Sequence, residues 1–305
     1  MILKKLSIAM VTAIVLSLKT GITANATTLN FTDFSDLSSL SLNGSAKAIN
    51  RIRPVFFNGQ NVLRLTNNFN QSGSAFLTDR LSLADDASFS TAFSFQITNP
   101  QGAFDEDGQG ADSIVFVVQN QSNNVGGAGG GIGYAGIKPS IGIEFDTWNN
   151  TINGINENGN HIGINLNGSI HSVIKKNVRT RMNNGAVWYS WVDYNGVSDL
   201  LEVRLSQTAT RPDASFLSYT VDLASILGTP NAFIGFTSGT GGASGDHDIR
   251  SWTFRNSYNP IGIQQPASVP EPSSALGLLT FGALGIASML KRKRQQKVLN
   301  SVATN

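Results

Sequence analysis

Short runs of hydrophobic residues alternate with polar clusters along most of the chain. The runs are rich in Val, Ile, Phe, Thr and Trp, and clusters of Gly, Asn, Ser and Pro separate them. This spacing is typical of β-strands joined by turns. The predicted strands are Asn61–Thr66, Phe89–Thr98, Ser113–Asn120, Ile141–Thr147, His161–Leu166, Ala186–Tyr194, Leu200–Gln207, Ser215–Leu223, Ala232–Thr237 and Asp248–Phe254.

Several of these runs alternate strictly between apolar and polar side chains. In Leu200–Leu205, for example, Glu202 and Arg204 face one side and the apolar residues between them face the other. No long stretch has a helical period, and only Leu223–Leu227 suggests a helical turn. About a dozen strands in one stretch without internal repeats predict an all-β fold, a single two-sheet sandwich.

The first 26 residues have the three-part pattern of a secretory signal peptide. Lys4 and Lys5 precede the apolar run Leu6–Leu18, and Ala24–Ala26 offers a small-x-small cleavage site. We therefore predict residues 1–26 to be a signal peptide rather than a short buried helix. The chain has no cysteine, so the exported part forms no disulfides.

The C-terminal end predicts a second targeting element. Residues 273–290 form an uncharged run at the short end of what spans a membrane, and Lys291–Arg294 follow directly. We predict a linker at 263–272, a transmembrane helix at 273–290 and a basic cytoplasmic tail at 291–305. The Pro-Glu-Pro element Pro270–Pro272, followed by the span and the basic tail, resembles the PEP-CTERM sorting signal of exported bacterial proteins.

That resemblance implies a cell-surface or extracellular-matrix protein whose tail is cut by a sorting protease near the Pro-Glu-Pro element. A permanent membrane anchor through the C-terminal helix is the alternative that hydropathy alone would fit equally well.

The positive net charge of +2 belongs to the two ends of the chain. Between residues 27 and 267 there are 14 basic and 19 acidic residues, a net charge of about −5. Nucleic-acid binding needs clustered Lys and Arg on the folded part. The short run from Lys175 to Arg181 is better interpreted as a solvated edge or turn, so we predict no nucleic-acid partner.

Two loops are rich in glycine, at 126–136 and 239–245. The first satisfies the spacing of a dinucleotide-binding fingerprint, but that motif requires a helix after it. Here Pro139 and a predicted strand follow, which excludes the dinucleotide interpretation. Glycines in such loops close tight turns or let a ligand approach backbone N–H groups.

Candidate chemistry concentrates at the end of one predicted strand. Glu144 and Asp146 project to the same face, Trp148 and Asn150 follow, and His161 opens the next predicted strand. Carboxylate and amide oxygens suit Ca²⁺, whereas an imidazole suits a transition ion such as Mn²⁺. Composition alone also permits a surface pair of acids and a structural histidine.

An ordered set of motifs covers the domain from about residue 27 to 255 and resembles the signature stretches of legume-type (L-type) lectins. The stretches are Ala111–Phe116, Gly129–Gly133, Glu144–Asn150, His161–Ile164, Tyr219–Leu223, Ile234–Thr237 and His247–Phe254. The resemblance implies a concanavalin A-like two-sheet β-sandwich (jelly roll) over residues 27–262. It also implies a non-enzymatic, carbohydrate-binding protein.

Carried over to this chain, the family pattern implies two metal ions. Glu144 and His161 would hold the transition ion, Asp146 would bridge both ions, and Asn150 with the Trp148 carbonyl would bind Ca²⁺. The family also has a bridging Asp between these last elements. This chain has Asn156 followed by Glu157, so either Glu157 substitutes or ion affinity is reduced.

The same resemblance implies a sugar site. Asp112, a backbone N–H of Gly130, Asn150 and the ring of Trp148 would contact the sugar, and a cis peptide would precede Asp112. A carboxylate and an amide fix vicinal hydroxyls, while an aromatic face covers the apolar C–H side of a sugar. The glycine-rich 239–245 loop, which sets specificity in the family, does not identify the sugar.

Two other classes of protein compete with a lectin. A retaining glycoside hydrolase with the same architecture resembles E-x-D-x-x-E, but Asn149 stands where its second Glu would be. A structural or adhesive matrix protein without sugar binding is favoured by Asn156. The Asp105–Gly108 segment lacks the rest of a calcium loop, and we interpret it as a solvated turn. Association into a homo-oligomer stays open.

Overall fold

The computed structural model describes residues 27–50, 60–83, 86–106, 108–126, 131–150 and 158–262. The predicted signal peptide and all segments from residue 263 onward lie outside these residues. Within them, no helix is long and apolar enough to cross a membrane. The described residues up to Ile261 belong to one compact unit.

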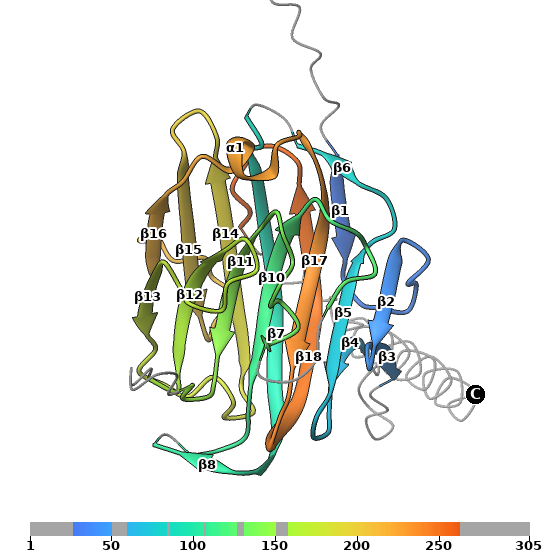
Figure 1. Cartoon of the computed structure of the whole chain (residues 1–305), viewed down its shortest axis with the longest axis vertical. Helices are drawn as coiled ribbons and strands as arrows, with labels where there is room; N and C mark the ends of the chain where they lie inside the picture. The colour runs from blue at the N-terminus through green and yellow to red at the C-terminus, as the bar shows by residue number, and fades with distance from the viewer. Residues whose placement is uncertain are drawn as a thin grey trace, which may run out of the picture. The chain divides into compact units, whose positions relative to one another are not determined.

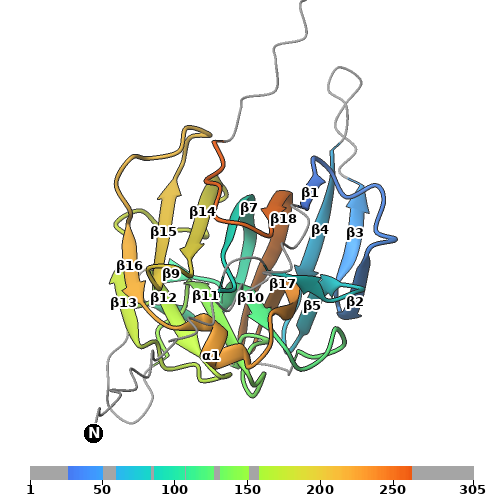
Figure 2. The ribbon, with the colours of Figure 1, turned by 90° about the horizontal axis from the view of Figure 1, so that it is seen from above.

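Two antiparallel sheets of eight strands each face one another across a hydrophobic core (Figures 1 and 2). The back sheet follows the order β16 (Leu217–Thr220), β15 (Leu200–Ser206), β14 (Val187–Asn195), β7 (Phe89–Gly102), β18 (Ala243–Arg255), β4 (Asn61–Thr66) and β3 (Lys47–Asn50), with β1 (Thr28–Phe31) paired to β18. The front sheet follows the order β13 (Ile174–Asn177), β12 (His161–Leu166), β11 (Ser140–Asp146), β10 (Ser113–Gln119), β17 (Asn231–Gly239), β5 (Ser72–Leu77) and β2 (Leu40–Gly44), with β6 (Leu81–Ser82) paired to β17. The predicted all-β two-sheet sandwich is therefore confirmed.

Two further short elements complete the described structure. A hairpin of β8 (Phe104–Asp105) and β9 (Gly108–Gln109) lies between β7 and β10 in the sequence. The predicted helical turn is present as α1 (Leu223–Leu227), which Asp222 caps by accepting a hydrogen bond from the Ser225 N–H.

The core forms because alternate residues of each strand point between the sheets. Phe93 of β7 illustrates the contact, since its ring meets Phe236 of the front sheet edge-on at 5.0 Å and Phe145 edge-on at 5.6 Å. Edge-to-face pairs of this kind add to the free energy gained by burying apolar surface. The rings therefore hold the two sheets at a fixed spacing.

All ten strands predicted from the pattern are present, but their lengths differ. β7 and β18 extend to 14 and 13 residues, because Gly, Asn and charged residues at their ends still pair in the back sheet. The prediction omits short or polar strands, including β2, β3, β5 and β13. Lys175 and Lys176 lie on β13, the edge strand of the front sheet, in agreement with the predicted edge.

A second hydrophobic cluster covers part of the outer side of the front sheet. Ile132, Tyr134 and Ile137 from the glycine-rich loop pack on Val115 and Val117 of β10. The loop leads into β11 rather than into a helix, which agrees with the exclusion of a dinucleotide site. The loop instead seals the sheet face beside the candidate site.

An ion-pair cluster lies on the outer side of the back sheet. Asp193 of β14 is fully buried, and its carboxylate pairs with Arg211 and lies 3.5 Å from Arg204 Nη1. Arg204 also donates to the Asp213 carbonyl at 3.3 Å, so the cluster fastens the 207–216 segment to the sheet. Removing one partner of a buried ion pair leaves the other charge without compensation.

We therefore expect Asp193→Ala to lower the free energy of unfolding by about 3–5 kcal/mol, because two guanidinium groups lose their carboxylate. Glu202→Gln removes a partly exposed partner of Arg204 and should cost less than about 1 kcal/mol. Urea denaturation of the two variants measures the difference. Equal losses would contradict the assignment of the cluster to Asp193.

Candidate functional site

The pairing register of two neighbouring strands, β11 and β12, places the candidate ligands together. Asp146 lies opposite His161, and Glu144 lies opposite Gly163, across the β11–β12 pair. Ile143 and Phe145 point into the core, so Glu144 and Asp146 point to the outer face of the front sheet. Because its side chains alternate, β11 contributes apolar residues to the core on one face and candidate ligands on the other.

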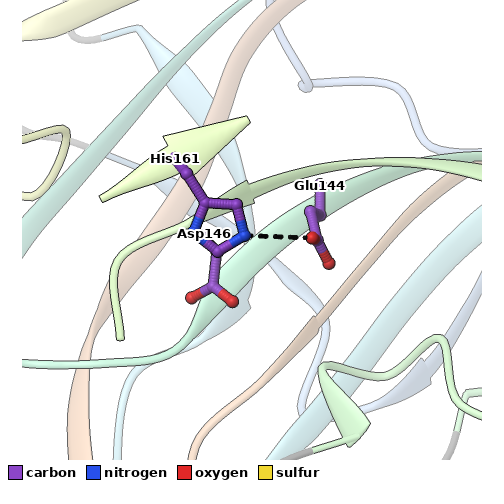
Figure 3. A group of neighbouring side chains, drawn as sticks. All are labelled: Glu144, Asp146 and His161. Carbon is purple, nitrogen blue, oxygen red and sulfur yellow. Dashed lines mark hydrogen bonds and ion pairs between the residues drawn. The ribbon is translucent and has the colours of Figure 1, made fainter. Parts of the chain in front are cut away.

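Glu144, Asp146 and His161 each offer a ligand atom, and these atoms all lie within 4.8 Å of one another. Figure 3 shows the three side chains, with His161 Nε2 3.2 Å from Glu144 Oε1. The other ring nitrogen, Nδ1, is 2.7 Å from the carbonyl of Asn158. All three side chains are buried, which is costly for charges without partners and suits a cation.

Glu144 is held by residues that the sequence did not reveal. Asn165 Nδ2 donates to Glu144 Oε2 at 2.6 Å, and Ser172 Oγ donates to Oε1. Gly163 is required for this approach, since a Cβ there would lie 2.3 Å from Glu144 Oε1. The alternation of His161, Gly163 and Asn165 on one face of β12 was the available signal.

The charges in this cluster shift one another's protonation. Burial raises the pKa of Asp146 well above its ordinary value; the imidazole of His161 opposes this effect and Glu144 adds to it. Burial alone would lower the pKa of His161. The hydrogen bond to Glu144 and the charge of Asp146 outweigh burial and raise that pKa to about 9. The imidazole of His161 is therefore protonated at neutral pH in the ion-free cluster.

Asp146 also shapes the turn that follows β11. Its Oδ1 accepts from the Trp148 N–H at 2.9 Å, and its Oδ2 accepts from Asn150 Nδ2 at 3.3 Å. Trp148 and Asn150 are half-buried. A flip of the Asn150 side-chain amide would place its oxygen, rather than its nitrogen, beside the Asp146 carboxylate. Together these oxygens would be suitable ligands for Ca²⁺.

Asp112 lies at the same end of the sheet, immediately before β10. The Ala111–Asp112 peptide is cis, as expected from the resemblance. The Asp112 carbonyl accepts from Thr147 N at 2.9 Å and from Thr147 Oγ1 at 2.6 Å, which ties Asp112 to the end of β11. A Cβ on Gly241 would lie 3.9 Å from Asp112 Oδ2, so the 239–245 loop borders this carboxylate.

The Asp112 carboxylate is buried, and its Oδ2 has no hydrogen-bond partner among the described residues. Burial raises the pKa of Asp112 to about 7. A ligand whose hydroxyl group donates a hydrogen bond to this oxygen would satisfy it, and the free energy recovered would favour binding.

Glu106 is exposed in a turn, as the interpretation of Asp105–Gly108 as a solvated turn expects, but the two described acids of this segment also make hydrogen bonds to distant residues. Asp105 accepts from the Asn149 N–H, and Glu106 accepts from both Asn149 and Gly159. These partners are about 40 to 50 residues away in the sequence. Burial opposes the effect, but the bonds from Asn149 and Gly159 hold the pKa of Glu106 below its ordinary value.

Three of the predicted site residues, Gly130, Asn156 and Glu157, lie outside the described residues, so their roles stay predictions. The His247–Asp248 pair lies within β18 rather than at its start. His247 bonds to Thr66, and Asp248 pairs with Arg64 at 2.7 Å, which agrees with a role in the fold.

The donor set fits the ions that the resemblance implies. Two carboxylates and an imidazole within reach of one another are suitable transition-ion ligands, and Asp146 with Asn150 adds oxygen ligands. A bound cation would relieve the burial of the carboxylates. Its chemistry would be to fix Asp146 and Asn150 in place, not to take part in a reaction.

A two-sheet sandwich with this cluster and a buried aspartate at one end is the architecture of a lectin. Residues 26–270 match the family model described as "Legume lectin domain", and the chain belongs to that family. Residues 268–293 match the PEP-CTERM protein-sorting motif, which confirms the second resemblance. Legume lectins are non-enzymatic carbohydrate-binding proteins and bind Ca²⁺ and a transition metal.

Individual relatives of the chain are also lectins or proteins with a lectin domain. The chain is 31% identical over 249 residues to an L-type lectin-domain containing receptor kinase of Arabidopsis thaliana, covering 76% of this chain and 32% of that protein. It is 33% identical over 179 residues to a bark lectin of Styphnolobium japonicum, covering 55% and 61%. The chain thus spans only part of these relatives.

Among solved structures, peanut lectin matches with a TM-score of 0.59 and 26% identity, covering 76% of this chain and 97% of the lectin. A lectin from Bauhinia forficata in complex with GalNAc has the same TM-score and identity, and the match covers 77% and 100%. The concanavalin A-like sandwich predicted from the motifs is confirmed, and so is the prediction of a non-enzymatic protein.

Ion binding near pH 7 should release a proton, because the imidazole of His161, with its pKa of about 9, is protonated in the ion-free cluster and acts as a ligand only without that proton. Affinity for Mn²⁺ should therefore increase with pH. Calorimetry in two buffers of different ionisation enthalpy measures the protons released. Identical heats in both buffers would show that the cluster is already deprotonated.

Asp112 should make the ion-free domain less stable as pH rises. Its pKa of about 7 exceeds the value of about 3.9 in the unfolded chain, so the unfolded state loses the proton first. This contribution is absent below about pH 4 and reaches at most about 4 kcal/mol above pH 7. Urea denaturation in the presence of a chelator measures the free energy of unfolding at each pH, and Asp112→Asn should make it depend less on pH. Parallel pH profiles for the variant and the unchanged chain would contradict the raised pKa of Asp112.

Proposed function

We propose that this chain is an exported lectin that recognises a sugar on the cell surface or in the extracellular matrix with the assistance of Ca²⁺ and a transition ion such as Mn²⁺. The observation that supports this most directly is the buried Asp112 carboxylate, one oxygen of which has no partner within the described part of the chain, at the same end of the sheet as the Glu144–Asp146–His161 cluster. Membership of the legume lectin domain family supports the class of ligand.

In this proposal Glu144 and His161 hold the transition ion, and Asp146 bridges to the Ca²⁺ that Asn150 and the Trp148 carbonyl bind. Asn156 and Glu157 are the remaining candidate ion ligands. The ions fix the turn after β11, so that Asn150 needs no reordering when the sugar arrives.

Sugar hydroxyls would donate to Asp112 and pair with Asn150, which satisfies the buried carboxylate. The Trp148 ring would cover the apolar face of the sugar, and Gly130 would contribute its backbone N–H. The small residues of the 239–245 loop leave space beside Asp112.

Export and sorting follow from the two ends of the chain. We propose residues 1–26 as a signal peptide, 27–262 as the lectin domain, 263–272 as the linker, 273–290 as the membrane helix and 291–305 as the cytoplasmic tail. The sorting motif at 268–293 supports delivery to the cell surface and processing by a sorting protease.

A structural matrix protein that lacks sugar binding is the second candidate, because Asn156 lacks the negative charge of a bridging aspartate. The two candidates differ in whether ions and a glycan bind. The buried Asp112 oxygen favours the lectin, since a purely structural protein gains nothing from a buried carboxylate oxygen that none of the described residues satisfies.

A glycan array with the full chain in mild detergent tests the proposal. We expect binding to at least one glycan with Ca²⁺ and Mn²⁺, and loss of that binding in a chelator. Asp112→Ala should weaken binding at least 100-fold and leave the protein folded, because it removes a ligand contact and an unsatisfied buried group together.

Asp79→Asn is the matched control, because Asp79 is exposed and follows β5 at the opposite end of the front sheet. It should bind glycans as the unchanged chain does. Binding to no glycan under any ion condition would favour the structural candidate. Binding that survives Asp112→Ala would overturn the assignment of the sugar site.

A further inference from the structure

Two exposed aromatic side chains adjoin the glycine-rich 239–245 loop. Three aromatic side chains are exposed in the described part of the chain: Phe69 at 39%, Phe104 at 70% and Tyr258 at 44%. Tyr258 follows β18 at the remote end of the sandwich. Phe104 comes directly after Ala103, whose N–H donates to a carbonyl of the loop at 3.2 Å. Phe69 belongs to neither hydrophobic cluster, so the core does not account for it.

Close contacts place Phe69 against two glycines of this loop. A Cβ built on Gly102 would lie 2.6 Å from Phe69 Cε1 and 2.5 Å from the carbonyl oxygen of Gly242, so the ring edge and this carbonyl approach the same point. The residue after Phe69, Asn70, donates from its N–H to the Gly241 carbonyl at 3.2 Å. The Phe69 ring therefore borders the Gly241–Gly242 backbone.

The Asp112 carboxylate borders the same two glycines. A Cβ on Gly241 would lie 3.9 Å from Asp112 Oδ2. A Cβ on Gly242, which is exposed, would meet no atom of the described residues within 4 Å outside its chain neighbours. Successive Cα atoms are about 3.8 Å apart, so the Asp112 carboxylate and the Phe69 ring are separated by a distance on the order of 10 Å. Two linked sugar rings span a distance of this size.

The turn that carries Phe69 is fixed to the loop through Thr240. Thr240 Oγ1 accepts from the Gln71 N–H at 2.9 Å and donates to the Asn68 carbonyl at 2.5 Å. Gln71 Oε1 accepts from the N–H groups of Asn67 and Asn68 at 2.8 and 3.0 Å. Because this backbone is already ordered, a ligand that contacts the ring loses little affinity to the ordering of the turn.

The size of the exposed ring favours one sugar unit over a protein partner. A stable protein interface buries roughly 800 Å² on each partner. A whole aromatic side chain buries only roughly 150–250 Å², and Phe69 is already partly covered. A sugar ring offers a small apolar C–H face and polar hydroxyl edges, which match an aromatic face next to a carboxylate.

We propose that Phe69 forms a second sugar subsite, where its ring contacts the unit linked to the sugar bound at Asp112. This inference rests on the proposed function, because the first unit must bind at Asp112. It makes Phe69 a specificity-determining residue and identifies the ligand as a glycan of at least two linked units.

Paired sugar probes test the inference. The full chain, in mild detergent with Ca²⁺ and Mn²⁺, is titrated with galactose, N-acetylgalactosamine, mannose, glucose and fucose, each as the monosaccharide and as the terminal unit of disaccharides. We expect a disaccharide to bind about 5- to 20-fold more tightly than its monosaccharide, a gain that aromatic contact can supply. Phe69→Ala should remove this preference and leave the monosaccharide affinity unchanged, because Asp112 is intact.

Two further variants serve as controls. Phe69→Trp keeps an aromatic face and should keep the preference for the disaccharide. Tyr258→Ala removes an exposed aromatic side chain at the remote end and should change neither affinity. Since both positions are exposed, all three variants should melt within a few degrees of the unchanged chain.

The outcomes separate this inference from the proposed function. If the unchanged chain binds a monosaccharide and its disaccharides equally well, or if Phe69→Ala keeps the preference, the second subsite is wrong and the sugar site at Asp112 stands. If Phe69→Ala weakens both probes by the same factor, Phe69 only supports the 239–245 loop, and the second subsite is again wrong. If the unchanged chain binds none of the probes, both proposals fail.

Discussion

The register of β10, β11 and β12 is the constraint on which both the fold and the site depend. Because side chains alternate along a strand, Ile143 and Phe145 enter the core only when Glu144 and Asp146 leave it on the other side. A slip of one residue would bury the acids between the sheets and expose the aromatic ring. The packing of Phe145 against Phe93 and Phe95 therefore also sets the position of the acids.

The acids on the outer face are buried too, and the surrounding side chains determine whether that burial is tolerated. Asn165, Ser172 and His161 satisfy Glu144, while the turn after β11 satisfies Asp146. Asp112 differs, since no residue that the structure describes bonds to one of its oxygens. A buried group that the fold leaves unsatisfied reduces stability, and a ligand that satisfies it recovers this free energy as binding.

The sequence pattern was sufficient for those features that depend on neighbouring residues. Alternation identified β11 and β12 and the shared face of Glu144 and Asp146, and the ordered motifs identified the family. It was insufficient for β2 and β3, which are short, and for the hairpin acids. The contact of Glu106 with Gly159 joins residues 53 apart, and no local pattern encodes a pairing at that separation.

The last strand, β18, runs from the candidate site to the opposite end of the sandwich. β18 begins at Ala243, beside the loop that borders Asp112, and ends at Arg255, which pairs with Thr28. Thirteen extended residues cover roughly 40 Å, so the chain leaves the sandwich far from the candidate site. Asn259 still bonds to Ser90 at that remote end. The Asp112 carboxylate and the C-terminal end of β18 thus lie at opposite ends of the sandwich, because one long strand pair, β7 with β18, runs between them.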